Sequence, residues 1–195
     1  YESFEGKLSD SNWVPDYGPS KFNSKSGVTA TGARSILIAY NVNLDTDNKS
    51  ITNKIAGKLR SSGILKKDTQ GEKIIGEDGK AERIPGRFES LQGAGWMYDD
   101  TTAQVSMNLL DYTITGLHDV TDAIRELASE TDNCTTAGEL VGLVPLQAIL
   151  DSGRHYLGHD DEESILIQNA VEGLQLDQLG DFIIEQRIIE YAAGV

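Results

Sequence analysis

The run SILIAYNVNL at residues 35–44 constrains the fold more than any other part of the sequence. Its apolar and polar side chains alternate with a period of two, which predicts a β-strand with two unlike faces. One face carries Ile36, Ile38, Tyr40, Val42 and Leu44. The other face carries Leu37, Ala39, Asn41 and Asn43. A chain with such a strand must bury one face under helices or a second sheet.

The segments that follow this strand supply helices for that purpose. The apolar spacing predicts a helix at about 48–62, a hairpin with strands near 88–98 and 102–112, a helix at about 117–130 and a strand at 139–144. The succession is strand, helix, strand, strand, helix, strand, which indicates an α+β fold of the ferredoxin-like βαββαβ type.

Several segments lie outside this succession. Residues 64–87 are charged and rich in glycine, and we expect a long, mobile surface insertion there. Pro145 fits the first turn of a further helix, and Asp160 with Glu163 predicts a capped helix at about 161–174. The tail FIIEQRIIEYAAGV is compatible with either a helix or an extended chain. We therefore expect additional C-terminal helices.

A ferredoxin-like sheet carries its helices on one face and leaves the other face open. The polar side chains expected on the open face are Asn41, Asn43, Gln104, Ser106 and Asn108. Such a row of amides and hydroxyls suits recognition of a polar ligand. It is equally compatible with plain solvation of an exposed sheet face.

The composition limits the classes of partner and compartment. The 195 residues carry a net charge of −14, which argues against a nucleic-acid or anionic-membrane binder because phosphate contacts need clustered Lys and Arg. Cys134 is the only cysteine, so no internal disulfide forms and the reducing cytoplasm is the simplest compartment. We find no signal peptide and no apolar run long enough to span a bilayer.

The titratable residues give no assignable catalytic group and no metal site. His155 and His159 stand four apart, but Gly158 interrupts the helix between them, and the helix dipole accounts for a histidine there. His118 is either an acid–base group or a polar residue of a first helical turn. We expect Cys134 to be a small packing residue rather than a nucleophile.

Long motifs in register resemble the glutamate formimidoyltransferase family. They are PDYGPSKFNSKSGVTATGARSILIAYNVNL, GAGWMYDDTTAQVSMNLLDYTITGLH, GELVGLVPLQAIL and RIIEY, in that order. The match runs from about Trp13 to Tyr191. The departures are TGLH, where the family tends to have proline before Leu-His, and AGELVGL, where it tends to have Gly-Ser before Glu or Gln. Gly116 and Gly138 are the residues at which the sequence departs from the family pattern.

The resemblance implies that residues 1–33 are a joining segment with a ligand-binding loop and that residues 34–195 are the second, C-terminal formiminotransferase subdomain. It implies a cytoplasmic transferase of one-carbon metabolism that moves the formimino group from N-formimino-L-glutamate to N5 of tetrahydrofolate, its co-substrate, in histidine degradation. The N-terminal formiminotransferase subdomain, which holds the family's general base, would be a partner. The complete protein would be a homo-oligomer.

The joining segment would hold the folate. The resemblance assigns this role to Gly18, Pro19, Ser20, Lys21, Phe22, Asn23, Ser24, Lys25, Ser26 and Gly27. Glycines let backbone N–H groups approach a ligand, the lysines suit its carboxylates, and Phe22 suits an aromatic ring. A solvated hinge loop is the other interpretation of this segment. A non-catalytic ferredoxin-like module that binds folate or a protein is the alternative for the whole chain.

Overall fold

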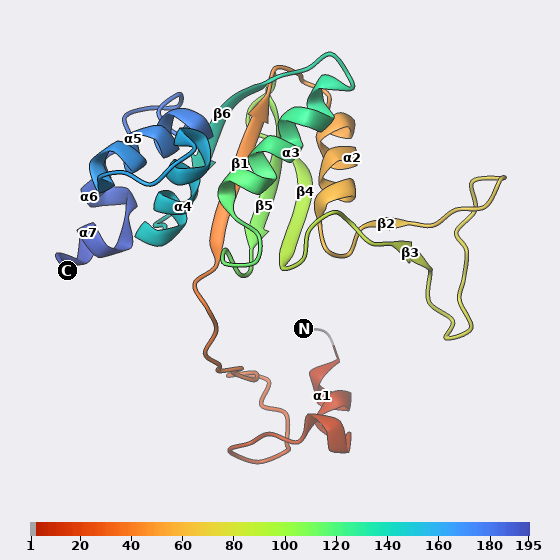
Figure 1. Ribbon diagram of the computed structural model, residues 1–195. Helices are drawn as coiled ribbons and strands as arrows, with labels where there is room; N and C mark the ends of the chain where they lie inside the picture. Colours follow the sequence, from red (N-terminus) through yellow and green to blue (C-terminus); the bar gives the residue numbers. More distant parts are fainter. Residues whose placement is uncertain (1–2) are drawn as a thin grey trace. The chain divides into compact units, whose positions relative to one another are not determined.

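The computed structural model describes residues 3–195, which divide into two compact units with the boundary between Arg34 and Ser35 (Figure 1). The first unit holds one short helix, α1 (Phe4–Lys7), and a 3₁₀ turn at Ser11–Trp13. The ammonium of Lys7 lies 4.7 Å from the centroid of the Trp13 ring. The rest of this unit is turns and irregular chain.

The second unit is built on a four-stranded sheet with the strand order β4-β5-β1-β6. The strands are β1 (Ile38–Leu44), β4 (Leu91–Met97), β5 (Ala103–Leu109) and β6 (Thr135–Leu140). All three pairings between neighbouring strands are antiparallel. This sheet with its helices confirms the α+β class. The closer ferredoxin-like designation stays a prediction, which the order β1-α2-β4-β5-α3-β6 supports.

One face of the sheet forms the core with two helices. In β1 this face carries Ile38, Tyr40, Val42 and Leu44, all nearly inaccessible to solvent. Helix α2 (Lys49–Leu59) packs on β4 and β5, and α3 (Leu117–Ser129) packs on β1 and β6. The buried hydroxyl groups of Tyr40 and Thr121 lie 2.9 Å apart, which ties β1 to α3.

The remaining helices follow β6. They are α4 (Leu146–Leu157), α5 (Glu163–Leu174), α6 (Ile184–Arg187) and α7 (Ile189–Ala193), so the tail is helical in two short pieces. Gly158 ends α4 in the left-handed conformation, as the sequence predicts. Asp160 does not cap α5, because its carboxylate binds Arg154 and the helix starts at Glu163. None of the helices among residues 3–195 is long and apolar enough to cross a membrane.

The insertion at 64–87 is more ordered than its composition indicates. It contains the short strands β2 (Ile64–Leu65) and β3 (Arg83–Ile84), which pair with each other. Three backbone hydrogen bonds link Lys66, Ile74 and Glu82 in a closed ring. Asp68 accepts backbone N–H groups from Gln70 and Glu72 in a turn. The polar residues of this segment therefore form hydrogen-bonded turns rather than unstructured chain.

Gly138 marks the closest approach between the sheet and the C-terminal half of the unit. Its N–H donates to Gln175 O at 2.9 Å. A Cβ at this position would lie 2.2 Å from Leu174 O and 2.9 Å from the Tyr40 hydroxyl oxygen. The end of α5 therefore reaches β6 only because residue 138 has no side chain.

We expect Gly138→Ala to destabilise the chain, because the methyl group must displace backbone atoms. Overpacking of this kind costs about 1–3 kcal/mol. The matched control is Gly93→Ala, also in a strand on the core face, where the nearest atoms to a Cβ lie 3.5 Å away. Chemical denaturation of both variants tests this. Equal unfolding free energies for the two variants would contradict the expectation.

Candidate functional site

The polar face of the sheet brings together the amides that the sequence predicts there. The strand register pairs Asn41 with Ser106, Asn43 with Gln104 and Ala39 with Asn108, so all five polar side chains lie on the face opposite the core. Asn41, Asn43 and Gln104 are 8%, 2% and 3% exposed. Plain solvation is therefore wrong for these three, because their amides are buried although they lie outside the apolar core.

These amides form a hydrogen-bonded cluster around Glu139. Asn41 Nδ2 donates to Glu139 Oε2 at 2.9 Å, and Gln104 Nε2 donates to the same oxygen at 3.4 Å. Gln104 Nε2 also donates to Asn43 Oδ1 at 3.1 Å. Buried amides are stable only when they are paired in this way. We call Asn41, Asn43, Gln104 and Glu139 the amide cluster.

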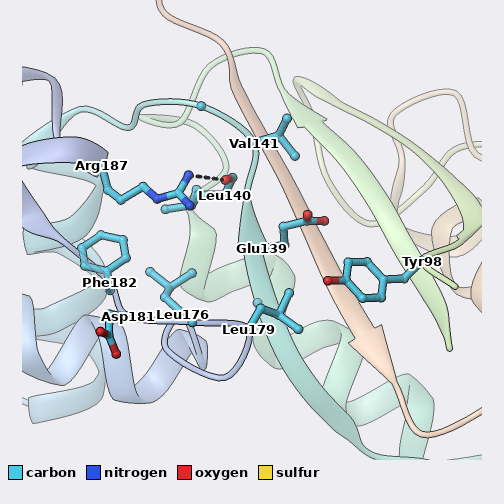
Figure 2. A pocket seen from close by; sticks show the side chains of 12 residues that line it. Tyr98, Glu139, Leu140, Val141, Leu176, Leu179, Asp181, Phe182 and Arg187 are labelled. Carbon is cyan, nitrogen blue, oxygen red and sulfur yellow. Dashed lines mark hydrogen bonds between the residues drawn. The ribbon is translucent and has the colours of Figure 1, made fainter.

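A groove of about 380 Å³ lies along β6 beside the amide cluster (Figure 2). Its lining includes Tyr98, Glu139, Leu179, Phe182 and Arg187. Figure 2 shows the Tyr98 hydroxyl directed toward the side of β6 that carries Glu139. Arg187 lies on the other side of the strand, and its Nη1 donates to Leu140 O at 3.4 Å. The groove thus offers a carboxylate, a guanidinium and apolar side chains to a ligand.

The sequence pattern did not predict Glu139 as a site residue, because the apolar run ELVGLV indicated a strand at 139–144. The strand is Thr135–Leu140, and its register sets Glu139 opposite Asn41. Residues 141–143 leave the strand, and Val141 and Leu143 are exposed. The amides on the polar faces of β1 and β5 were the available signal for Glu139. They need a hydrogen-bonding neighbour on the adjacent edge strand, β6.

The loop from Gly18 to Gly27 lies in the first unit and is organised around Asn23. Asn23 Oδ1 accepts the backbone N–H groups of Lys25 and Ser26, and Asn23 O accepts that of Gly27 at 2.7 Å. A shallow pocket of about 430 Å³ is lined by Pro19, Lys21, Phe22, Asn23, Ser24 and Lys25.

The backbone and charges of this loop fit both interpretations of it. Gly18 and Gly27 have φ angles of 86° and 64°, which L side chains rarely adopt. Lys21 and Lys25 are exposed, and neither forms an ion pair with any residue between 3 and 195. Their folate-binding role stays a prediction.

His118 and His155 meet at the junction of α3 and α4 rather than at the amide cluster. Their rings stack with centroids 4.6 Å apart. His118 Nδ1 lies 3.3 Å from Ser152 Oγ, and His155 Nε2 lies 2.7 Å from Asp122 Oδ2. Because α3 packs on the core face, neither ring faces Glu139. Burial is the main cause that lowers the pKa of His118.

The other two titratable candidates, His159 and Cys134, each lie beside an aspartate. His159 is exposed and lies 3.4 Å from Asp161, and residues 3–195 hold no group of three His, Cys, Asp or Glu side chains that could bind a metal ion. Cys134 is exposed rather than packed inside. Its thiol donates to Asp45, and this hydrogen bond raises the pKa of the thiol. The rise disfavours the reactive thiolate.

The burial of His118 at the junction of α3 and α4 should make the unfolding free energy of the chain depend on pH. Because the pKa of His118 in the folded chain lies below its ordinary value of 6.5, the unfolded chain binds the proton more readily. Stability should therefore be full above about pH 6.5 and should fall as the pH drops toward the folded pKa.

We expect His118→Gln to lose less stability than the wild type between pH 7 and pH 5. Urea unfolding across this range measures the difference. His159→Gln, which changes an exposed histidine, is the control and should follow the wild type. A wild-type slope that His118→Gln leaves unchanged would show that this ring does not cause the dependence.

Comparisons with known proteins agree on one family. A family model described as the formiminotransferase domain matches residues 39–194. The formimidoyltransferase-cyclodeaminases of Rattus norvegicus and Mus musculus are each 40% identical over 196 residues, which cover 98% of this chain and 33% of each relative. The glutamate formimidoyltransferase of Streptococcus pyogenes serotype M1 is 34% identical over 162 residues, which cover 83% of this chain and 47% of that relative. The chain spans about a third of the length of the first relatives. It belongs to the formiminotransferase family.

Proposed function

We propose that this chain is the folate-binding half of a cytoplasmic glutamate formimidoyltransferase. The reaction would transfer the formimino group from N-formimino-L-glutamate to N5 of the co-substrate tetrahydrofolate, in histidine degradation. The amide cluster beside the groove along β6 is the observation that carries the proposal, and relatives of the chain bear the name glutamate formimidoyltransferase. A pterin and an amidine both present donors and acceptors that such a surface can bind.

The residues of the groove match the chemical groups of the two substrates. Both substrates carry carboxylates, which suit the exposed guanidinium of Arg187. Both carry N–H groups, which suit Glu139 and the amide oxygens. The apolar lining at Leu179 and Phe182 suits the hydrocarbon and aromatic parts of a folate.

In this reaction we assign to the chain the binding and orientation of the two substrates. N5 attacks the formimino carbon, and a new C–N bond forms while N5 gives its proton to a base. The tetrahedral centre then breaks its bond to the glutamate nitrogen, which leaves with a proton. His118 and His155 pack at the α3–α4 junction, so we assign the base to an N-terminal subdomain outside this chain. Holding two polar substrates together is a large part of such a rate enhancement.

We expect the chain alone to show no formimino transfer at an enzyme-like rate. The assay is formation of 5-formiminotetrahydrofolate from both substrates. A fusion of the chain to the amino-terminal half of the Streptococcus pyogenes relative should restore turnover. Turnover by the chain alone that His118→Ala abolishes would contradict the proposal and make His118 catalytic. A fusion that binds folate without turnover would favour the non-catalytic binding module.

The loop at Gly18–Gly27 gives a separate expectation for folate affinity. Lys21→Ala and Lys25→Ala should each remove at most one charge-assisted hydrogen bond, worth roughly 1.5–3 kcal/mol or about ten- to a hundredfold. Exposure of both lysines places the loss at the low end. The double variant should also weaken the salt dependence of binding, measured by calorimetry on the fusion at two salt concentrations.

The matched control for charge is the double variant Lys54→Ala, Lys80→Ala, which removes two exposed lysines elsewhere in the chain. It should retain wild-type affinity. Wild-type affinity and salt dependence in the Lys21→Ala, Lys25→Ala variant would identify the loop as a solvated hinge.

A further inference from the structure

Glu139 is the one carboxylic acid side chain of the amide cluster. Asn41 and Gln104 both donate to Oε2, at 2.9 and 3.4 Å. Oε1 accepts no hydrogen bond from any residue between 3 and 195. The two amides therefore hold the side chain in place and leave one carboxylate oxygen free for a ligand.

No cation within the described chain neutralises this carboxylate. Glu139 is half-buried and forms no ion pair with any residue from 3 to 195. Arg187, the cation of the groove, lies on the other side of β6 with its guanidinium on Leu140 O (Figure 2). A half-buried carboxylate without a counter-charge is costly, and a ligand that donates hydrogen bonds to it would lower that cost.

We propose that Glu139 is the recognition carboxylate for a planar N–C–N group that donates two parallel N–H bonds. This inference rests on the proposed function. A carboxylate and such a group match in geometry, as in bidentate pairs with guanidinium. The free Oε1 and the second lone pair of Oε2 supply the two acceptors. Tetrahydrofolate carries the group at its 2-amino and N3–H edge, and formiminoglutamate carries it as a protonated amidine.

The inference makes Glu139 a specificity residue. A ligand that lacks one N–H leaves a desolvated carboxylate oxygen without a donor, which sites of this kind penalise strongly. Glutamine at position 139 still accepts a bond from Asn41, but it presents an N–H donor where the ligand also has one. Glu139→Gln should therefore abolish the preference for the complete donor pair while leaving the fold intact.

The experiment compares two pairs of ligands by calorimetry, on the full chain and on the fusion described above. One arm sets tetrahydrofolate against its analogue with methyl in place of the 2-amino group. The other sets N-formimino-L-glutamate against N-formyl-L-glutamate. We expect the wild type to prefer the complete donor pair at least tenfold in one arm, and that arm identifies the ligand. Glu139→Gln should lose the preference in the same arm.

Two further variants keep the test decisive. Glu126→Gln removes a carboxylate on α3 that pairs with Arg87 and does not line the groove, and it should keep the wild-type preference. Glu139→Asp keeps the charge and should keep part of the preference, with urea unfolding checking both position-139 variants. If Glu139→Gln and Glu139→Asp both keep the wild-type preference, the role of Glu139 is overturned, but the proposed function is not. Failure of the wild-type fusion to bind any of the four ligands overturns the proposed function and this inference together.

Discussion

The register of β1 is the constraint on which the rest of the second unit depends. Tyr40 and Asn41 are neighbours in sequence and point to opposite faces of the sheet. The buried hydroxyl of Tyr40 bonds Leu174 O and lies within hydrogen-bond distance of Thr121, so it ties α3 and the end of α5 to the strand. Burial raises the pKa of Tyr40 to about 12, and the hydroxyl stays a neutral donor. Asn41 meanwhile bonds Glu139. A slip of one residue would turn the asparagines into the apolar core and place the tyrosine on the polar face.

The groove along β6 lies between two points where the C-terminal segment bonds to this part of the chain. Gly138 N–H donates to Gln175 O, and beyond the strand Val144 and Ile188 form a parallel bridge. Glu190 accepts the backbone N–H of Leu146 at 2.8 Å, at the start of α4. The glutamate of the RIIEY motif thus acts as a helix cap supplied from a distance. Between these fastenings the edge of β6 faces the groove rather than another strand.

Sequence patterns predicted elements where local periodicity and tertiary pairing agree. The alternation of β1 and of β5 and the apolar stripe of α3 were predicted correctly in kind and nearly in extent. The strand at 139–144 was misplaced because ELVGLV is the more apolar run, whereas pairing with β1 selects Thr135–Leu140. That error hid Glu139, whose importance depends on two strands distant in sequence. The short strands at 64–87 were missed because their order comes from turn hydrogen bonds, which hydrophobic periodicity does not report.

The charge of the chain explains why a site of this kind must depend on local contacts. A net charge of −14 repels ligands that carry several carboxylates, so long-range attraction does not concentrate them. At physiological ionic strength charges beyond about 8 Å are largely screened, and the repulsion weakens accordingly. What remains is the short-range pairing of individual groups. Arg187 in the second unit, and Lys21 and Lys25 in the first, are cations without a carboxylate partner among the described residues. Glu139 places a hydrogen-bond acceptor in the groove of a protein that already repels anions. At that point of the groove, ligand groups with N–H donors are therefore favoured over carboxylates.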